Sequence, residues 1–259
     1  MKKKACYFIG IVIMIGILLF FVMKDPYTID KSHSLQGPSW SHWLGSDYLG
    51  RDLFSRLIIG MGYSLSYSCL SLIGVIVIIL VLGGLAGTLR GFVDTVITTF
   101  ADILISIPAM LLALVFAGLF SNTVFTVLIA ISLSWSGRYI RYVRNLVLTI
   151  RKEEYIVLAP MRGSEGMHTL VHHVTPALIP ELTSLFLTDI GRVMLNVSGL
   201  AFLGIGVHPP VPELGTILYD GKMYFYSAPW LFIFPGILLS LIILASQYLG
   251  SRVKVRKVE

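Results

Sequence analysis

The chain has 259 residues, of which 56% are hydrophobic and only 13% are charged. Soluble domains carry roughly a quarter charged residues, so this composition predicts a protein of the lipid bilayer and argues against a soluble enzyme. The net charge of +6 would suggest nucleic-acid binding in a soluble protein. In a membrane protein the distribution of basic residues over the loops matters more, so we expect no nucleic-acid partner.

The N-terminal segment combines a cluster of lysines with a long uncharged run. Lys2–Lys4 precede residues 5–23, which contain no charged residue. The run ends in bulky apolar residues and not in the small residues of a signal-peptide cleavage site, so we interpret it as a membrane span. Residues 1–24 are therefore expected to form an N-terminal transmembrane anchor, followed by an extracytoplasmic segment over residues 25–63.

Three spans are expected in the middle of the chain. The charge-free run between Arg56 and Arg90 exceeds the ~20 residues that cross the hydrocarbon core of a membrane. A second run, residues 103–137, would measure about 52 Å as one helix, whereas the hydrocarbon core is only ~30 Å thick. We therefore expect this stretch to fold back at the polar residues 121–123. Pro108 should kink the span that precedes this turn, because its ring displaces a backbone hydrogen bond.

Two further spans complete the predicted bundle. The spans on either side of the turn are expected at residues 95–120 and 124–141, and the last two at 177–203 and 230–249. The sequence thus predicts six transmembrane helices, with both ends of the chain on the same side of the membrane.

The basic residues indicate which side that is. With a cytoplasmic N-terminus, the inside segments hold fourteen lysines and arginines and the outside segments five. The positive-inside rule then places both termini in the cytoplasm. Residues 142–176 form the inside segment that is long enough to present a folded surface to a cytoplasmic partner, and residues 251–259 are expected to be a cytoplasmic tail.

Four ionisable residues that fall within or beside predicted spans are Asp102, Glu181, Asp189 and Arg192. A charge at mid-membrane costs at least about 2.5 kcal/mol and usually faces a bundle interior or a pathway, so Asp102, Asp189 and Arg192 are candidate pathway residues. Asp189 and Arg192 lie three residues apart on one helical face and could instead neutralise each other as a structural pair. Asp102 has no evident partner on its own helix.

Motifs for metal or nucleotide chemistry are incomplete. His168 and His172 have the spacing of a zinc site but lack the glutamate of a His-Glu-x-x-His motif, so a solvated basic helix explains them better. Gly221-Lys222 lacks the upstream glycine of a phosphate-binding loop. The two cysteines cannot build a disulfide framework or a thiolate site. We therefore expect no bound metal or cofactor and no catalytic residues in this chain.

Three separated motifs resemble one family of membrane proteins. Residues 154–163 read EYIVLAPMRG and resemble the EAA loop of ABC-importer permeases. Residues 45–52 read GSDYLGRD and resemble the GTDxLGRD signature of C-type subunits of the dipeptide, oligopeptide and nickel permeases. Residues 202–236 resemble the segment between the last two spans of that family. The resemblance extends over about residues 40–250.

This resemblance implies an architecture and a set of partners. The fold would be all-α, a polytopic ABC type I importer permease fold of the MetI-like kind, with the permease domain at residues 64–250 and located in a bacterial cell membrane. The partners would be a second homologous permease, two cytoplasmic ATPases that bind ATP and magnesium, and an external solute-binding protein. The cargo would be a di- or oligopeptide, nickel or a metal chelate, and Glu154, Ala159 and Gly163 would contact the ATPase.

The loop departs from the family pattern, which leaves alternatives open. Val157, Leu158 and Pro160 replace the usual Glu-Ala-Ala-Arg register, and a proline inside a helix costs ~3 kcal/mol or more, so the first docking helix is expected to end or bend at Ala159. One alternative is a secondary carrier, which inverted repeats and paired intramembrane charges would support. The other is a non-transporting assembly subunit with a degenerate coupling loop, for which a bulky substitution of Gly163 would change nothing.

Overall fold

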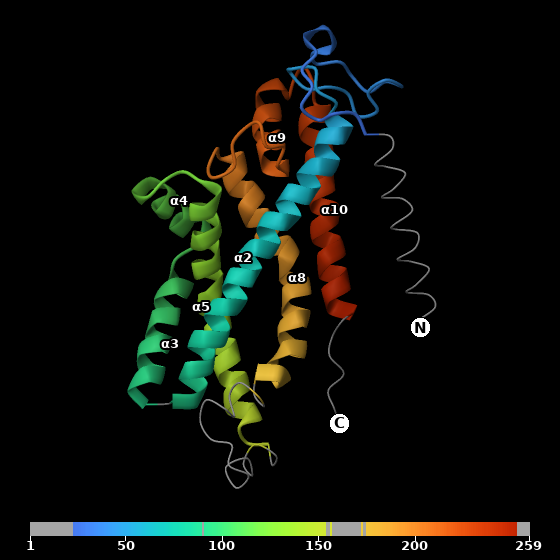
Figure 1. Ribbon diagram of the computed structural model, residues 1–259. Helices are drawn as coiled ribbons and strands as arrows, with labels where there is room; N and C mark the ends of the chain where they lie inside the picture. The colour runs from blue at the N-terminus through green and yellow to red at the C-terminus, as the bar shows by residue number, and fades with distance from the viewer. Residues whose placement is uncertain (1–22, 90, 154–155, 157–171, 173–174, 253–259) are drawn as a thin grey trace, which may run out of the picture.

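The computed structural model describes residues 23–89, 91–153, 156, 172 and 175–252. Within these residues the regular elements are helices, arranged as an elongated bundle (Figure 1). The elements, in chain order, are η1 (Lys31–His33), α2 (Leu53–Leu89), α3 (Gly91–Ser106), α4 (Ala109–Leu119), α5 (Val124–Ile150), α8 (Thr175–Phe202), α9 (Leu214–Gly221), η4 (Lys222–Tyr224) and α10 (Trp230–Arg252).

The long helix α2 connects the two ends of the bundle (Figure 1). It packs along α5 and α8, and α10 packs on the far side of α8. Residues 25–52, here called the cap, lie with α9 at the end of the bundle where α2 and α10 begin. The opposite end holds the last turns of α2 and α5 and the first turn of α8. The end with the cap and the opposite end, here called the loop end, are therefore formed by different parts of the chain.

Several helices have the length and composition of membrane spans. Among the described residues, α2, α8 and α10 are long and apolar enough to cross a membrane, and α3 with α4 qualifies as a pair bent by 93°. Helix α5 is outside this set, since it carries Arg138, Arg141 and Arg144. The predicted anchor at residues 1–24 lies almost entirely outside the described residues. The total of six spans therefore stays a prediction.

The predicted breaks in the third and fourth spans are confirmed. Helix α3 ends at Ser106 and α4 begins at Ala109, with Pro108 at its N-cap. The turn lies at residues 121–123, where the Thr123 side chain accepts a hydrogen bond from the backbone N–H of Thr126 at 3.4 Å. A proline stops the helix because it cannot donate its own backbone hydrogen bond.

Two helices extend beyond their predicted limits. Helix α2 begins at Leu53, so the end of the expected 25–63 segment is already helical. Helix α5 continues to Ile150, past the expected end at residue 141. The arginines that suggested the end of the span instead lie on the surface of a continuous helix.

Small residues allow α2 and α5 to pack closely. A Cβ atom built on Gly83 would lie 2.9 Å from Cβ of Val143, and one on Gly87 would lie 2.7 Å from Cβ of Val147. Such distances are too short for ordinary carbon contacts, so the two helix backbones approach only because these side chains are absent.

Candidate functional site

The cap is built around the Gly45–Asp52 motif. Asp47 Oδ1 accepts hydrogen bonds from the backbone N–H groups of Leu49 at 2.8 Å and Arg51 at 2.9 Å, which closes a tight turn. Gly50 has φ +76°, and a Cβ atom there would lie 1.7 Å from the carbonyl oxygen of Asp30. The motif therefore needs glycine at this position for both conformation and space.

The last residue of the motif starts α2. Asp52 Oδ2 accepts from the backbone N–H of Ser55 at 2.9 Å and from its hydroxyl at 2.7 Å. The other carboxylate oxygen lies 3.0 Å from Nδ1 of His42. A carboxylate that accepts the free N–H groups of the first turn stabilises a helix N-terminus, so the motif anchors the cap to α2.

A buried group of four charges connects the cap with α9. Arg51 Nε lies 2.6 Å and Arg56 Nε 3.5 Å from Asp47 Oδ2. Asp220 Oδ2, from α9, lies 3.9 Å from Arg56 Nη2 and 4.0 Å from Arg51 Nη2. Burial raises the pKa of Asp220, although the two arginines act in the opposite direction. Two positive and two negative charges balance one another, so the group is a neutral clamp between the cap and α9.

Glu213 forms a second buried connection that the sequence analysis missed. Its Oε1 accepts from the hydroxyls of Ser64 on α2 at 2.6 Å and Ser198 on α8 at 2.5 Å. Its Oε2 accepts from the backbone N–H groups of Gly215 at 2.6 Å and Thr216 at 3.1 Å, which caps α9. The capping pattern could have been recognised in the sequence, but contacts with residues 64 and 198 depend on the folded bundle.

Asp189 and Arg192 form the ion pair that their spacing suggested. Arg192 Nη1 lies 2.9 Å from Asp189 Oδ1, and the Tyr139 hydroxyl donates to the other carboxylate oxygen. The Asp189 side chain is 6% exposed, whereas that of Arg192 is 52% exposed. The pairing is thus confirmed, with one member inside the bundle and the other on its surface.

Asp102 finds its partner on a different helix. It pairs with Arg141 of α5, and both side chains are about half exposed. One turn further along α5, Arg144 holds Asp94 of α3 through two contacts of 2.5 Å each. Asp102 and Asp189 consequently belong to separate ion pairs, and the structure does not bring the three predicted pathway residues together in one cluster.

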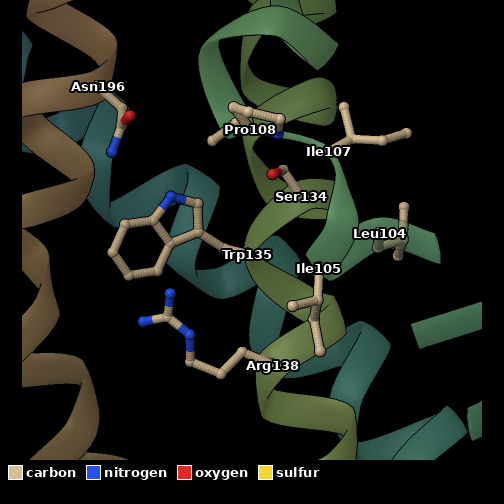
Figure 2. A pocket seen from close by; sticks show the side chains of 9 residues that line it. Leu104, Ile105, Ile107, Pro108, Ser134, Trp135, Arg138 and Asn196 are labelled. Carbon is tan, nitrogen blue, oxygen red and sulfur yellow. The ribbon is translucent and has the colours of Figure 1, made fainter. Parts of the chain in front are cut away.

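The break between α3 and α4 opens a pocket that faces α5 and α8. Its volume is about 190 Å³. It is lined by Leu104, Ile105, Ile107, Pro108, Ala109, Ser134, Trp135, Arg138 and Asn196. Figure 2 shows the Trp135 indole between the Asn196 amide of α8 and the Arg138 guanidinium of α5. The guanidinium carbon of Arg138 lies 5.9 Å from the centroid of the Trp135 ring, a distance typical of a cation–π contact.

The predicted coupling residues Glu154, Ala159 and Gly163 lie outside the described residues, as do His168 and His173. The stem of this loop is described. Arg151 Nη1 donates to the carbonyl oxygens of Thr88 at 2.8 Å and Gly87 at 3.3 Å, and Ile156 is buried. The end of α5 is therefore fastened to the last turn of α2. The described part of the chain contains no cluster of three or more potential metal ligands.

Comparison with known proteins identifies the family. Residues 79–256 match the family described as "Binding-protein-dependent transport system inner membrane component". The chain belongs to this family. The permease is 36% identical over 230 residues to the nickel transport system permease protein NikC of Escherichia coli (strain K12), with 89% of this chain and 83% of that protein covered. It is 30% identical over 256 residues to the dipeptide transport system permease protein DppC of Alkalihalophilus pseudofirmus, with 96% of this chain and 84% of that protein covered.

These relatives confirm the resemblance to C-type permeases of ABC importers. Among solved structures, the MetNI methionine ABC transporter in inward facing conformations gives a TM-score of 0.56 at 19% identity, with 76% of this chain and 94% of that chain covered. This structural likeness confirms the predicted MetI-like permease fold. The permease is thus an inner-membrane subunit of an ABC importer.

Proposed function

We propose that this permease carries a di- or oligopeptide, nickel or a metal chelate across the bacterial inner membrane by using ATP hydrolysis of partner subunits. The observation that supports this most strongly is the 36% identity to a nickel transport permease over 89% of the chain. The complete transporter would contain a second homologous permease, two cytoplasmic ATPases with ATP and magnesium, and an external solute-binding protein. In this arrangement both termini are cytoplasmic and the cap faces the binding protein.

The loop between α5 and α8 is the proposed contact with the ATPase. Glu154, Ala159 and Gly163 would form the docking surface, and the fastened stem at Arg151 supports this role. A loop held firmly to α2 and α5 can pass a displacement to the bundle, whereas a loop on a free linker cannot. Movement between outward and inward access then needs only a bundle with two stable arrangements and a rigid contact.

The polar face of α5 and α8 is the proposed pathway. Arg192 of α8 lies on this face, and Asp102 of α3 borders it through its ion pair with Arg141 of α5. Both side chains are about half exposed in the isolated chain. Asp189 lies beneath the surface and holds Arg192 in place. We infer that this face meets the second permease around a water-filled passage, because half-exposed charges are costly against lipid.

Reconstitution into proteoliposomes tests the proposal. The permease pair with ATPases and binding protein should accumulate a labelled dipeptide or nickel when ATP is supplied, and the permease pair alone should accumulate neither. Gly163→Trp should abolish this uptake if the loop docks on the ATPase, and Gly62→Ala serves as a control because space around Gly62 is open. Uptake by the permease pair alone would indicate a secondary carrier. Uptake that is unchanged by Gly163→Trp would contradict the proposed coupling.

A further inference from the structure

Among the described residues, Arg138 differs from the neighbouring arginines of α5 in making no direct ion pair with a carboxylate. Arg141 pairs with Asp102, and Arg144 pairs with Asp94. Among the described residues, no carboxylate oxygen lies within 4 Å of the Arg138 guanidinium, whose recorded contact is the face of the Trp135 indole. The nearby Asp189 carboxylate attracts Arg138, but it is paired directly with Arg192. The pocket at the α3–α4 break therefore contains an exposed positive charge that no carboxylate of the described residues contacts directly.

The position of this charge in the bundle makes it costly. Arg138 lies about 21 Å along α5 from its first residue, at 1.5 Å per residue, and the hydrocarbon core is ~30 Å thick. A single arginine at such a depth is expected to face a bundle interior or a water-filled passage. The Trp135 contact compensates only part of the lost hydration, because a cation–π contact is weaker than an ion pair with a carboxylate.

Other polar groups line the same pocket. Asn196 donates its amide N–H to the carbonyl oxygen of Arg192 at 2.9 Å. Among the described residues, this leaves the amide oxygen of Asn196 without a donor. Ser134 adds a hydroxyl on the α5 side, and Figure 2 shows Ser134, Trp135 and Arg138 on α5 with Asn196 on the facing helix α8. The pocket thus offers a cationic donor at one end and a hydrogen-bond acceptor at the other.

We propose that this pocket is a transient binding site for a carboxylate group of the transported solute. Arg138 holds the carboxylate, since its guanidinium can donate two parallel N–H bonds to the two oxygens. The Asn196 amide oxygen accepts an N–H or O–H bond from the same solute, and Trp135 forms the flat wall between them. The inference rests on the proposed function and names the chemistry that the pathway recognises. Such a carboxylate occurs at the C-terminus of a peptide and in carboxylate chelators of metal ions.

Fluorine NMR of the assembled transporter in lipid nanodiscs tests this site directly. Tryptophan is replaced by 5-fluorotryptophan, and the signal of residue 135 is assigned by its loss in Trp135→Phe. The probes are diglycine, diglycine amide and citrate, added without the external binding protein. Diglycine should shift the signal in a saturable manner, whereas its amide, which lacks the carboxylate, should not. A matching shift with citrate would indicate that chelator carboxylates are accepted, and its absence would assign the site to peptides.

Variants of Arg138 separate binding from a purely structural cation–π contact. Arg138→Gln should weaken diglycine binding about tenfold or more, because it removes a hydrogen bond to a charged group. Arg138→Lys should retain the preference for the acid over the amide, with lower affinity. No shift with diglycine or citrate, an equal shift with the amide, or unchanged affinity in Arg138→Gln would overturn the proposal. Apart from Trp135→Phe, which assigns the signal, the comparison of acid with amide uses only the wild-type transporter.

Failure of the proposed carboxylate site can be distinguished from failure of the proposed function. ATP-dependent uptake by the wild-type transporter tests that function without reference to Arg138. A transporter that accumulates cargo but shows none of the predicted signal shifts would retain the proposed function and lose the carboxylate site. A transporter that binds diglycine but accumulates nothing would retain the site and lose the proposed function.

Discussion

The two polar regions of this permease differ in the burial and pairing of their charged side chains. At the cap end, the buried Asp47, Arg51 and Arg56 and the largely buried Asp220 balance one another. In the middle of the bundle, Arg138 is exposed and lies outside any ion pair of the described residues. Balanced buried charges hold elements together, whereas an exposed charge at membrane depth requires surroundings that only the assembled transporter provides. We therefore assign the cap charges to structure and propose that the mid-bundle charges serve transport.

The largest effect is expected from breaking the cap clamp. Asp47→Ala leaves Arg51 and Arg56 without their nearest carboxylate, and removing one partner of a buried ion pair costs about 3–5 kcal/mol. The free energy of unfolding, measured by titrating the purified permease from a mild detergent into SDS, should fall by this amount. Asp30→Asn is the control, since Asp30 pairs with His33 on the exposed surface and such pairs contribute little. Equal effects of the two substitutions would contradict the contrast between buried and exposed charges.

A smaller loss is expected from Glu213→Ala. The substitution removes an N-cap worth about 1 kcal/mol and leaves the buried hydroxyls of Ser64 and Ser198 without their acceptor, at about 1–3 kcal/mol. The same detergent titration measures the loss, and hydrogen exchange should increase in α9. Glu213→Gln keeps an acceptor oxygen of similar size and should lose less. If the glutamine variant is as unstable as the alanine variant, the hydrogen bonds do not explain the role of Glu213.

The close contact of α2 with α5 predicts the next effect. Gly83→Ala places a methyl group against Val143, and overpacking of this kind costs about 1–3 kcal/mol. Gly62→Ala, on the same helix but in open space, should not destabilise the protein, because alanine favours a helix over glycine. Equal stability of the two variants would show that α2 and α5 are further apart than the structure indicates.

The mid-bundle ion pairs should contribute least to stability. Asp102→Asn removes the partner of Arg141, and since both side chains are about half exposed, the free energy of unfolding should change by no more than about 1 kcal/mol. Uptake of cargo by the reconstituted transporter is the more sensitive measurement if this face lines the pathway. A loss of several kcal/mol in stability with normal uptake would show that this pair stabilises the fold and does not serve transport.

The parts of the fold that depend on local chemistry were predictable from the sequence. Pro108 breaks the helix at its own position, the polar residues 121–123 form a turn, and residues three apart meet on one helical face, as Asp189 and Arg192 do. The partner of Asp102 could not be predicted, because Arg141 lies on another helix and the pairing depends on how α3 packs against α5. The contacts of Glu213 with Ser64 and Ser198 likewise exist only after α2, α8 and α9 have assembled.

The extent of α5 shows where composition misled the prediction. Charged residues usually end a membrane span, so the predicted span ended at residue 141, but the helix continues to Ile150. The arginines are accommodated because Asp102 and Asp94 of α3 neutralise Arg141 and Arg144. A charged residue inside a span therefore indicates either an ion-pair partner on another helix or a transport pathway, and the sequence does not distinguish between the two.

Cysteine accessibility in the reconstituted transporter tests most directly whether the α5–α8 face lines the pathway. In a background with both native cysteines replaced by serine, Asn196→Cys should react with a water-soluble, membrane-impermeant thiol reagent, and the rate should change when ATP is added. Leu241→Cys, exposed on α10 at a position assigned to lipid, should remain unreactive in both conditions. An Asn196→Cys variant as unreactive as Leu241→Cys, or one whose rate is the same with and without ATP, would contradict an ATP-driven passage along this face.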